Sequence, residues 1–309
     1  MKTKIILAGG SGFLGRALAK RFLRKNYEVI VLTRSPQQRQ DGAKEIFWDA
    51  KTVGDWATTL DGAEAVINLT GKSVDCRYHA KNRRVIINSR VESTRAIGQA
   101  IGRCLAPPKT WLNASSATYY KHSFDRPNDE SGEIGATPEA RDAFSIEVIR
   151  QWERALDEAE TPKTRKVALR ATLVLGAEAG VFPVLRRLAQ FGLGGKMGSG
   201  RQMVSWIHEE DFCRAIEWIL AKENLTGPVN LAAPNPLSNR EMMRAICQRV
   251  GRPFGLPATE WMLEIGAFFL RTQTELILKS RFVVPGKLLA SGFQFQFPEL
   301  SGALRNLSR

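Results

Sequence analysis

Three glycines at a regular spacing are the residues whose chemistry is easiest to read from this 309-residue chain. Gly9, Gly12 and Gly15 follow an apolar run and open a segment with helical periodicity. In this arrangement the first glycine allows a tight turn, the second lets backbone approach a pyrophosphate, and the third lets the helix pack against a sheet. The N-terminus of the helix adds unpaired N–H groups and a positive dipole end. The pattern predicts a dinucleotide site made by these glycines with Ser11, Phe13 and Leu14.

The end of the second apolar run indicates which dinucleotide the chain prefers. Val29–Leu32 continues into Thr33-Arg34-Ser35, and no acidic residue follows until Asp41. An NAD site usually places a carboxylate here for the ribose 2′-hydroxyl, whereas an NADP site offers an arginine to the 2′-phosphate. A guanidinium with two hydroxyl groups suits a phosphate. We therefore expect NADP(H) at Thr33, Arg34 and Ser35; the alternative is that Arg34 is only a solvated loop charge.

The elements that position these residues alternate between strand and helix. Six runs are typical of buried parallel strands, namely Lys4–Ala8, Glu28–Leu32, Glu45–Trp48, Ala65–Leu69, Thr110–Ala114 and Lys166–Leu169. Helical periodicity separates most of them, notably over Ala80–Ala106 and Ala143–Ala159. The alternation predicts an α/β fold, a Rossmann doubly wound parallel sheet in residues 1–175. Shorter elements with many Gly and Pro residues predict a smaller mixed C-terminal substrate lobe in residues 176–309, over the carboxyl ends of the strands.

Composition narrows the class of protein. Four scattered cysteines without a C-x-x-C pair favour a reducing compartment, and three scattered histidines predict no metal site. Met1 leads directly into the first predicted strand, and the apolar segment Trp261–Leu270 is too short to span a bilayer. We therefore expect a cytoplasmic protein without a membrane partner. The net charge of +14 suits an anionic cofactor and substrate better than nucleic acid, because the basic stretches lack interleaved aromatic residues.

Many short motifs, in one order along nearly the whole chain, carry a family resemblance. They are Gly9–Gly15, Trp48-Asp49, Ile67–Gly71, Ser89–Thr94, Ala117–Tyr120, Leu169–Gly176, Gly194–Gln202, Trp206–Asp211, Gly227–Asn230, Arg252-Pro253 and Gly292–Pro298. With them the chain resembles the extended short-chain dehydrogenase/reductases. Within that group it is similar to the atypical epimerase family of NAD(P)-dependent sugar epimerases, whose C-terminal segment is a domain of unknown function.

The resemblance implies further contacts with the cofactor. Thr33 and Arg34 would hold its adenosine end, and Trp48 and Asp49 would flank the adenine. Leu69, Thr70 and Gly71 would line the cofactor after the fourth strand, with Arg77 approaching from the next loop. Tyr78 stands where the family commonly has Trp. Two of these motifs have a simpler interpretation: Trp48 could be core packing, and we favour packing for Gly292–Pro298, as a final strand whose alternating Phe residues seal an edge.

The proton-transfer pair of this superfamily is missing. Its members ordinarily use Tyr-x-x-x-Lys on the helix after the fifth strand, where the lysine lowers the pKa of the tyrosine. No tyrosine in this chain has a lysine four residues later. Alignment of the helix places Ser145 and Ile149 at the two positions, and neither can do that chemistry.

The remaining candidates follow the fifth strand. Ser115 or Ser116 takes the place of the usual hydrogen-bonding serine, and Tyr120 could act as an acid if Lys121 lowered its pKa. We select Ser115 and Tyr120 as the catalytic candidates. The alternative is that Tyr119 and Tyr120 wall the nicotinamide pocket and transfer no proton.

Two hypotheses about function remain. The first is an NADP(H)-dependent oxidoreductase or sugar epimerase, monomeric or homodimeric, whose small-molecule substrate is nucleotide-linked or phosphorylated. That substrate would meet basic residues of the second lobe, Arg186, Arg187, Lys196 and Arg201. The second is a non-catalytic NADP(H)-binding sensor or interaction protein. We expect His208, which precedes a helical segment, to cap or pack rather than to catalyse.

Overall fold

A seven-stranded parallel sheet forms the centre of the computed structural model, which describes residues 2–270 and 273–308. Its strand order is β10-β6-β5-β4-β1-β2-β3, and every neighbouring pair is parallel. The strands are β1 (Lys4–Ala8), β2 (Glu28–Thr33), β3 (Lys44–Phe47), β4 (Ala65–Asn68), β5 (Thr110–Ser116), β6 (Arg165–Ala171) and β10 (Gly227–Leu231). The strand order reverses between β1 and β4, which is where ligands bind in doubly wound sheets. The predicted Rossmann fold is confirmed.

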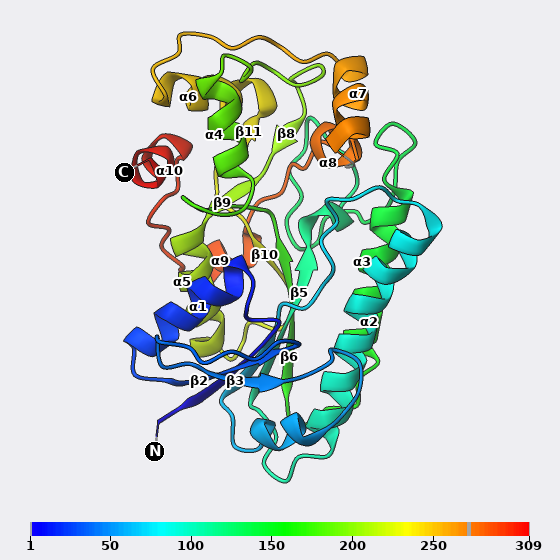
Figure 1. Ribbon diagram of the computed structural model, residues 1–309, viewed down its shortest axis with the longest axis vertical. Coiled ribbons are helices and arrows are strands. Elements are labelled where there is room, and N and C mark those ends of the chain that lie inside the picture. The colour runs from blue at the N-terminus through cyan, green and yellow to red at the C-terminus, as the bar shows by residue number, and fades with distance from the viewer. Residues whose placement is uncertain (1, 271–272, 309) are drawn as a thin grey trace.

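Helices cover both faces of this sheet (Figure 1). α1 (Phe13–Arg24) and α5 (Glu209–Ala221) share one apolar core with the strand residues Ile5 and Leu7. α2 (Ala80–Gly102) and α3 (Ala143–Asp157) lie on the other face, where Ile6 and Ala8 point. Successive residues of a strand point to opposite faces, so a continuous apolar run is what a sheet covered on both sides requires.

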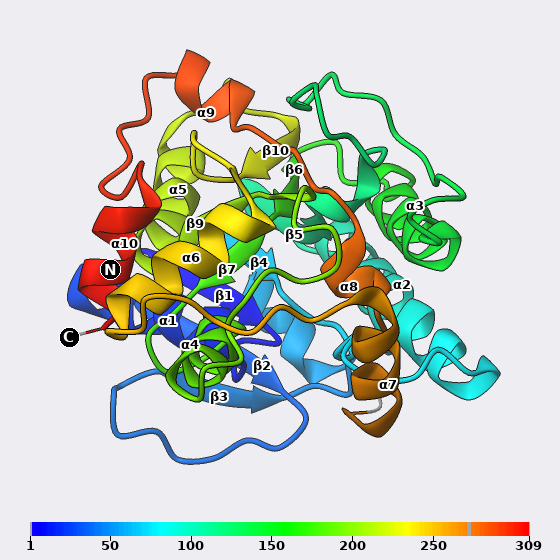
Figure 2. The same ribbon diagram turned by 90° about the horizontal axis from the view of Figure 1, so that it is seen from above.

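A second lobe lies over the carboxyl ends of the strands, as the view from above shows (Figure 2). α4 (Phe182–Gln190), α6 (Asn239–Arg249) and α10 (Leu300–Leu307) share a core of their own. Two small sheets pair β7 (Leu173–Leu175) with β9 (Trp206–His208), and β8 (Met203–Val204) with β11 (Leu237–Ser238). The remaining helices are α7 (Glu260–Leu270), α8 (Glu275–Leu278) and α9 (Gly286–Ala290), and the 3-10 turns are η1 (Asp55–Leu60) and η2 (Ala117–Tyr119).

The main sheet draws strands from both predicted parts of the chain. β10 lies after residue 175 and pairs with β6, so residues 1–175 do not complete the sheet by themselves. The predicted final strand at Gly292–Pro298 is wrong, because that segment is an extended loop without strand pairing. Its packing role is confirmed: Phe293 is buried, and the backbone N–H groups of Gln296 and Phe297 donate to the Asp211 carboxylate at 2.8 and 2.7 Å.

Candidate cofactor and substrate site

The glycine turn has the shape that a pyrophosphate requires. Gly9 has a φ of +71°, and a Cβ there would lie 2.8 Å from Thr70 Oγ1. A Cβ on Gly15 would lie 2.3 Å from the Gly10 Cα, so α1 can start against the turn only because residue 15 is glycine. A Cβ on Gly12, by contrast, would have no other atom closer than 3.9 Å. Gly12 also begins α1 without a side-chain cap, which leaves helix N–H groups facing open space.

Two further predicted segments converge on this turn. The Gly9 N–H donates to the carbonyl of Leu32, immediately before Thr33, at 3.0 Å, and the Leu69 N–H donates to the Ala8 carbonyl at 2.9 Å. Thr70 Oγ1 is buried beside Gly9 and has no hydrogen-bond partner among the residues that the structure describes. An orphaned polar atom in this position is what a bound ligand would satisfy.

Arg34 lies at the end of β2, beside this turn, and is exposed. The next arginine, Arg39, pairs with Asp41 and Glu45. Those two carboxylates therefore already have a cationic partner, and Arg34 keeps its charge for an anion. Ser35 is exposed as well, and its N–H donates to Thr33 Oγ1 at 3.4 Å.

Trp48 is a core residue in this structure. Its side chain is 2% exposed and its ring centre lies 5.0 Å from that of Trp56. The backbone N–H of Trp48 donates to the Thr33 carbonyl at 2.9 Å, which ties β3 to the Arg34 turn. Asp49 accepts hydrogen bonds from the N–H groups of Lys51 and Thr52 at 2.8 and 2.9 Å. The packing interpretation of Trp48 is confirmed, and contact of either residue with adenine stays a prediction.

The two predicted catalytic residues belong to a buried network on the α3 side of the sheet. Ser115 Oγ donates to Glu153 at 2.5 Å, and Arg170 donates to the same carboxylate at 2.9 and 2.8 Å. Tyr120 is 1% exposed; its hydroxyl group donates to Asn230 Oδ1 at 2.8 Å and accepts from Arg170 at 2.9 Å.

This surrounding does not prepare Tyr120 for proton transfer. Lys121, the neighbouring cation that could lower its pKa, pairs with Glu133. Burial raises the pKa of Tyr120, although Arg170 acts in the opposite direction. A catalytic role for Ser115 and Tyr120 therefore stays a prediction that the geometry does not favour, and the network gives both side chains a structural role.

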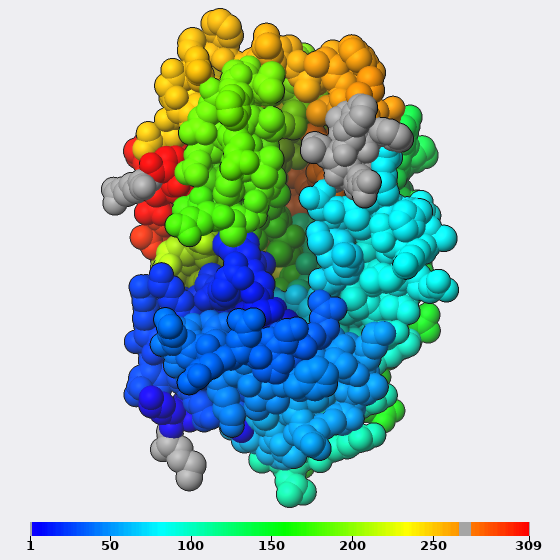
Figure 3. All heavy atoms as spheres, in the orientation of Figure 1, coloured from blue at the N-terminus to red at the C-terminus, as the bar shows by residue number. Residues whose placement is uncertain are grey.

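A cavity of about 1070 Å³ lies between the start of α2, the start of α3 and the α7–α8 segment. Figure 3 shows the molecular surface hollowed between α4 and the residues around the start of α2. Arg77, the last predicted cofactor residue, is in the cavity wall. The wall also includes Tyr78, Arg83, His122, Phe124, Glu139, Arg141, Phe144, Gln202, Glu260, Glu264 and Glu275. Its mixture of charges and aromatic rings suits a polar substrate with an apolar part.

His122 is held in one tautomer at this wall. The Ser280 N–H donates to His122 Nδ1 at 2.9 Å, so a neutral ring carries its proton on Nε2. Burial, followed by the charge of Lys279, lowers the pKa of His122. The ring is therefore a neutral hydrogen-bond donor at the cavity.

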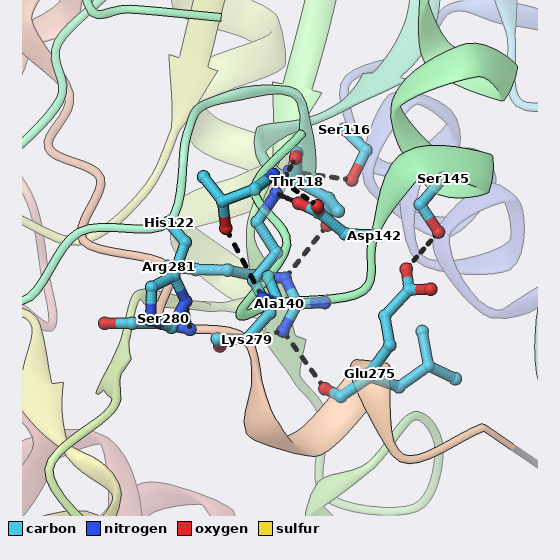
Figure 4. A network of polar contacts seen from close by, with 12 residues as sticks. Ser116, Thr118, His122, Ala140, Asp142, Ser145, Glu275, Lys279, Ser280 and Arg281 are labelled. Atoms are coloured by element: carbon cyan, nitrogen blue, oxygen red, sulfur yellow. Dashed lines mark hydrogen bonds and ion pairs between the residues drawn. The ribbon is translucent and has the colours of Figure 1, made fainter. Parts of the chain in front are cut away.

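C-terminal residues form a network of polar contacts beside His122 (Figure 4). Lys279 pairs with Asp142, the residue before α3, and donates to the Thr118 carbonyl at 2.6 Å. Arg281 Nε donates to Thr118 Oγ1 at 2.9 Å. Ser145, which the sequence alignment of the helix assigns to the position of the missing tyrosine, contacts the carboxyl group of Glu275. Sequence reasoning missed these C-terminal residues because they follow no spacing rule and meet α3 only through the fold.

His208 caps and packs, as expected. Its Nδ1 accepts the Glu210 N–H at 2.9 Å, its Nε2 lies 3.1 Å from Asn306 Oδ1, and its ring stacks on Phe297 at 4.0 Å. Within residues 2–270 and 273–308 there is no group of His, Cys, Asp or Glu side chains that could hold a metal ion. None of the helices in those same ranges has the length and apolar character needed to cross a membrane.

Known proteins match this chain over nearly its full length. Residues 5–232 match the NAD dependent epimerase/dehydratase family, and residues 258–307 match a domain of unknown function, DUF1731. Epimerase family protein SDR39U1 of Bos taurus is 30% identical over 98% of this chain and 99% of its own length. Epimerase family protein YfhF of Bacillus subtilis is 31% identical over 98% and 97%.

Two solved structures are similar as well. The crystal structure of human epimerase family protein SDR39U1 with NADPH is 28% identical, covers 99% of both chains and has a TM-score of 0.87. The nucleoside-diphosphate sugar epimerase of Corynebacterium glutamicum is 25% identical, with a TM-score of 0.78, over 100% of this chain and 58% of that one.

Proposed function

The chain belongs to the NAD dependent epimerase/dehydratase family, and on that premise we propose that it binds NADP(H) and acts on a small polar substrate in the 1070 Å³ cavity. The observation that carries the proposal is the open, uncapped start of α1 at Gly12, with exposed Arg34 beside it. The human relative that was crystallised with NADPH supports the choice of cofactor.

Each part of the cofactor has a matching group in the protein. The N–H groups at the start of α1 bind the pyrophosphate, and Arg34 with Thr33 and Ser35 binds the 2′-phosphate. Thr70 Oγ1 gains a partner, and Leu69 and Gly71 line the path toward the cavity. Arg77, in the cavity wall, is placed to contact cofactor or substrate. When bound, the nicotinamide supplies hydride transfer.

The cavity wall indicates the class of substrate. Arg77 and Arg83 give it cationic groups for a phosphate or carboxylate, while Phe124 and Phe144 offer aromatic surface. Arg141 pairs with Glu264 of the same wall. We therefore propose a phosphorylated or nucleotide-linked carbonyl or hydroxyl compound. The relative described as a nucleoside-diphosphate sugar epimerase supports this class. Of the expected basic residues, Arg201 has its guanidinium 5.6 Å from the ring centre of Phe124. A contact of Arg186, Arg187 or Lys196 with the substrate stays a prediction.

Calorimetric titration with NADPH and NADH tests the choice of cofactor. Arg34→Ala should weaken NADPH binding about tenfold to a hundredfold and leave NADH binding unchanged, since a charge-assisted hydrogen bond contributes about 1.5–3 kcal/mol. Arg103→Ala is the matched control, an exposed arginine at the far end of α2. Equal affinity of the unaltered protein for both cofactors would contradict the proposal.

A non-catalytic NADP(H)-binding protein is the second candidate. Ser145 and Ile149 stand where the Tyr and Lys pair would be, which favours it. A screen of carbonyl, alcohol and nucleotide-sugar compounds for absorbance changes of bound NADPH separates the two: turnover supports the enzyme, and confirmed binding without turnover supports the sensor.

A further inference from the structure

One carboxyl group stands beside the position that the missing tyrosine would occupy. Ser145 lies in the first turn of α3, and its Oγ contacts Glu275, the first residue of α8. Glu275 is 8% exposed and forms part of the cavity wall. In Figure 4 its second carboxylate oxygen has no partner among the residues drawn. A buried carboxyl group with one oxygen uncommitted is placed to exchange a proton with a molecule in the cavity.

The neighbouring cations are committed elsewhere. Lys279 pairs with Asp142, and Arg281 donates to Thr118 and to the carbonyls of Leu276 and Lys279. No salt bridge to Glu275 exists within the part of the chain that the structure describes. Burial raises the pKa of Glu275, while the Ser145 hydroxyl and the field of Arg281 act in the opposite direction. Burial is the larger effect, so the carboxyl group holds its proton at higher pH than an exposed glutamate does.

A phenol completes the cluster. Tyr78 also lines the cavity, and its ring centre lies 4.8 Å from that of Phe144, next to Ser145. Burial and the charge of Glu275 raise the pKa of Tyr78 to about 12, so it stays neutral at physiological pH. The titratable and charged groups around Glu275 are therefore Tyr78, Asp142, Lys279 and Arg281. Tyr78 can donate a hydrogen bond to a substrate, but it is a poor source of a proton.

We propose that Glu275, supplied by the C-terminal domain, is the proton-transfer residue of this active site, and that Ser145 positions it. The inference rests on the proposed function, which supplies NADPH and a carbonyl substrate. Glu275 donates its proton to the carbonyl oxygen as the carbonyl carbon accepts the hydride. The carbonyl is reduced to a hydroxyl group, NADPH is oxidised to NADP⁺, and Glu275 becomes a carboxylate that regains a proton from water.

The test uses the full chain, loaded with NADPH, and 4-nitrobenzaldehyde as the carbonyl probe. Glu275→Gln keeps the shape and a hydrogen bond to Ser145 but cannot donate a proton. It should lower the rate of NADPH oxidation about 10²-fold to 10⁴-fold. The rate of the unaltered protein should fall tenfold per pH unit above the pKa of Glu275, and Ser145→Ala should move that pKa. Glu147→Gln, on the exposed face of α3, is the matched control.

A second readout needs no turnover. In isotope-edited infrared spectra recorded from pH 4 to pH 8, the protonated-carboxyl band that persists to higher pH than those of exposed carboxyl groups should disappear in Glu275→Gln and remain in Glu147→Gln. An unchanged rate in Glu275→Gln, no NADPH oxidation in the unaltered protein, or no such band would each overturn the inference. Calorimetric titration of every variant with NADPH distinguishes failure of this inference from failure of the proposed function. If NADPH binds, only the role of Glu275 is rejected. If NADPH does not bind, the proposed function is rejected as well.

Discussion

At the scale of single residues, a row of polar side chains crosses the sheet beneath α2 and α3. Asn68 and Asn113 are register partners on β4 and β5, and Arg170 on β6 has Ser115 and Asn230 as its partners on either side. Their hydrogen bonds are made within the protein, for example Asn68 to Asn113 at 2.8 Å. Buried polar groups are stabilising only when they are paired in this way. The row therefore fixes the ends of four strands.

Tyr120→Phe tests whether that tyrosine is structural. The change removes a donor to Asn230 and an acceptor for Arg170, both inside the protein. We expect the free energy of unfolding in urea to fall by about 1–3 kcal/mol. NADPH binding and turnover should stay unchanged. Tyr27→Phe, a partly exposed tyrosine packed on Phe22, should change stability little. A stable Tyr120→Phe variant without turnover would instead support the predicted catalytic role of Tyr120.

Residue chemistry could be predicted from the sequence only where a short motif carries it. The glycine turn and the capping role of His208 depend on neighbours within a few residues. Glu275 could not be found in this way, because its meaning depends on a contact with Ser145, 130 residues away along the chain. The surroundings of Tyr120 could not be predicted for the same reason: Lys121 is adjacent in sequence, but its side chain pairs with Glu133.

At the scale of elements, hydrophobic runs located the strands because both faces of this sheet are covered. β10 was missed, since Gly227-Pro228 opens it and only three of its residues are fully buried. The opposite error occurs at Gly292–Pro298, which the sequence predicts as a strand and the structure shows as a loop. Its alternating Phe residues follow from packing against α5, and the Asp211 carboxylate satisfies backbone N–H groups that a strand partner would otherwise bind.

Replacement of glycine by alanine should affect stability differently at Gly15 and at Gly12, the two glycines at the start of α1. Gly15→Ala places a Cβ 2.3 Å from the Gly10 Cα, so α1 must move; we expect a loss of about 1–3 kcal/mol in stability, together with weaker NADPH binding. Gly12→Ala meets no atom within 3.9 Å and has a φ of −76°, which alanine accepts. It should fold normally and lose NADPH affinity at least tenfold. Thermal unfolding without cofactor, followed by NADPH titration, checks both; equal losses of stability would refute the distinction.

At the scale of the whole molecule, the last part of the chain joins the two lobes. Ser205 Oγ lies 2.8 and 2.9 Å from the carbonyl oxygens of Arg281 and Val283, within hydrogen-bond distance of both. The Asn128 N–H donates to the Phe282 carbonyl at 2.7 Å. Asn230 of the main sheet donates to the Val284 carbonyl at 3.0 Å. Residues 281–284 therefore contact the loop after β5, the second lobe and β10 together.

The buried contact between His208 and α10 predicts how stability depends on pH. Burial lowers the pKa of His208 in the folded chain. Between the unfolded pKa of about 6.5 and the lower folded value, the unfolded chain binds the extra proton. Stability should therefore fall as pH drops below about 6.5. His208→Asn keeps a side-chain cap, and its free energy of unfolding should fall less between pH 8 and pH 5.5. Parallel curves for the two proteins would contradict this.

Because residues 275–287 lie near the end of the chain, the cavity wall that they contribute can form only late in synthesis. The glycine turn and strands β1 to β6 emerge from the ribosome first, and domains generally begin to fold from the N-terminal side. The wall that carries Glu275, and the pairing of Lys279 with Asp142, can form only after the last tenth of the chain has been translated. A nascent chain therefore has the proposed dinucleotide surface before it has the complete cavity wall, and premature termination near the C-terminus would leave that surface without the cavity.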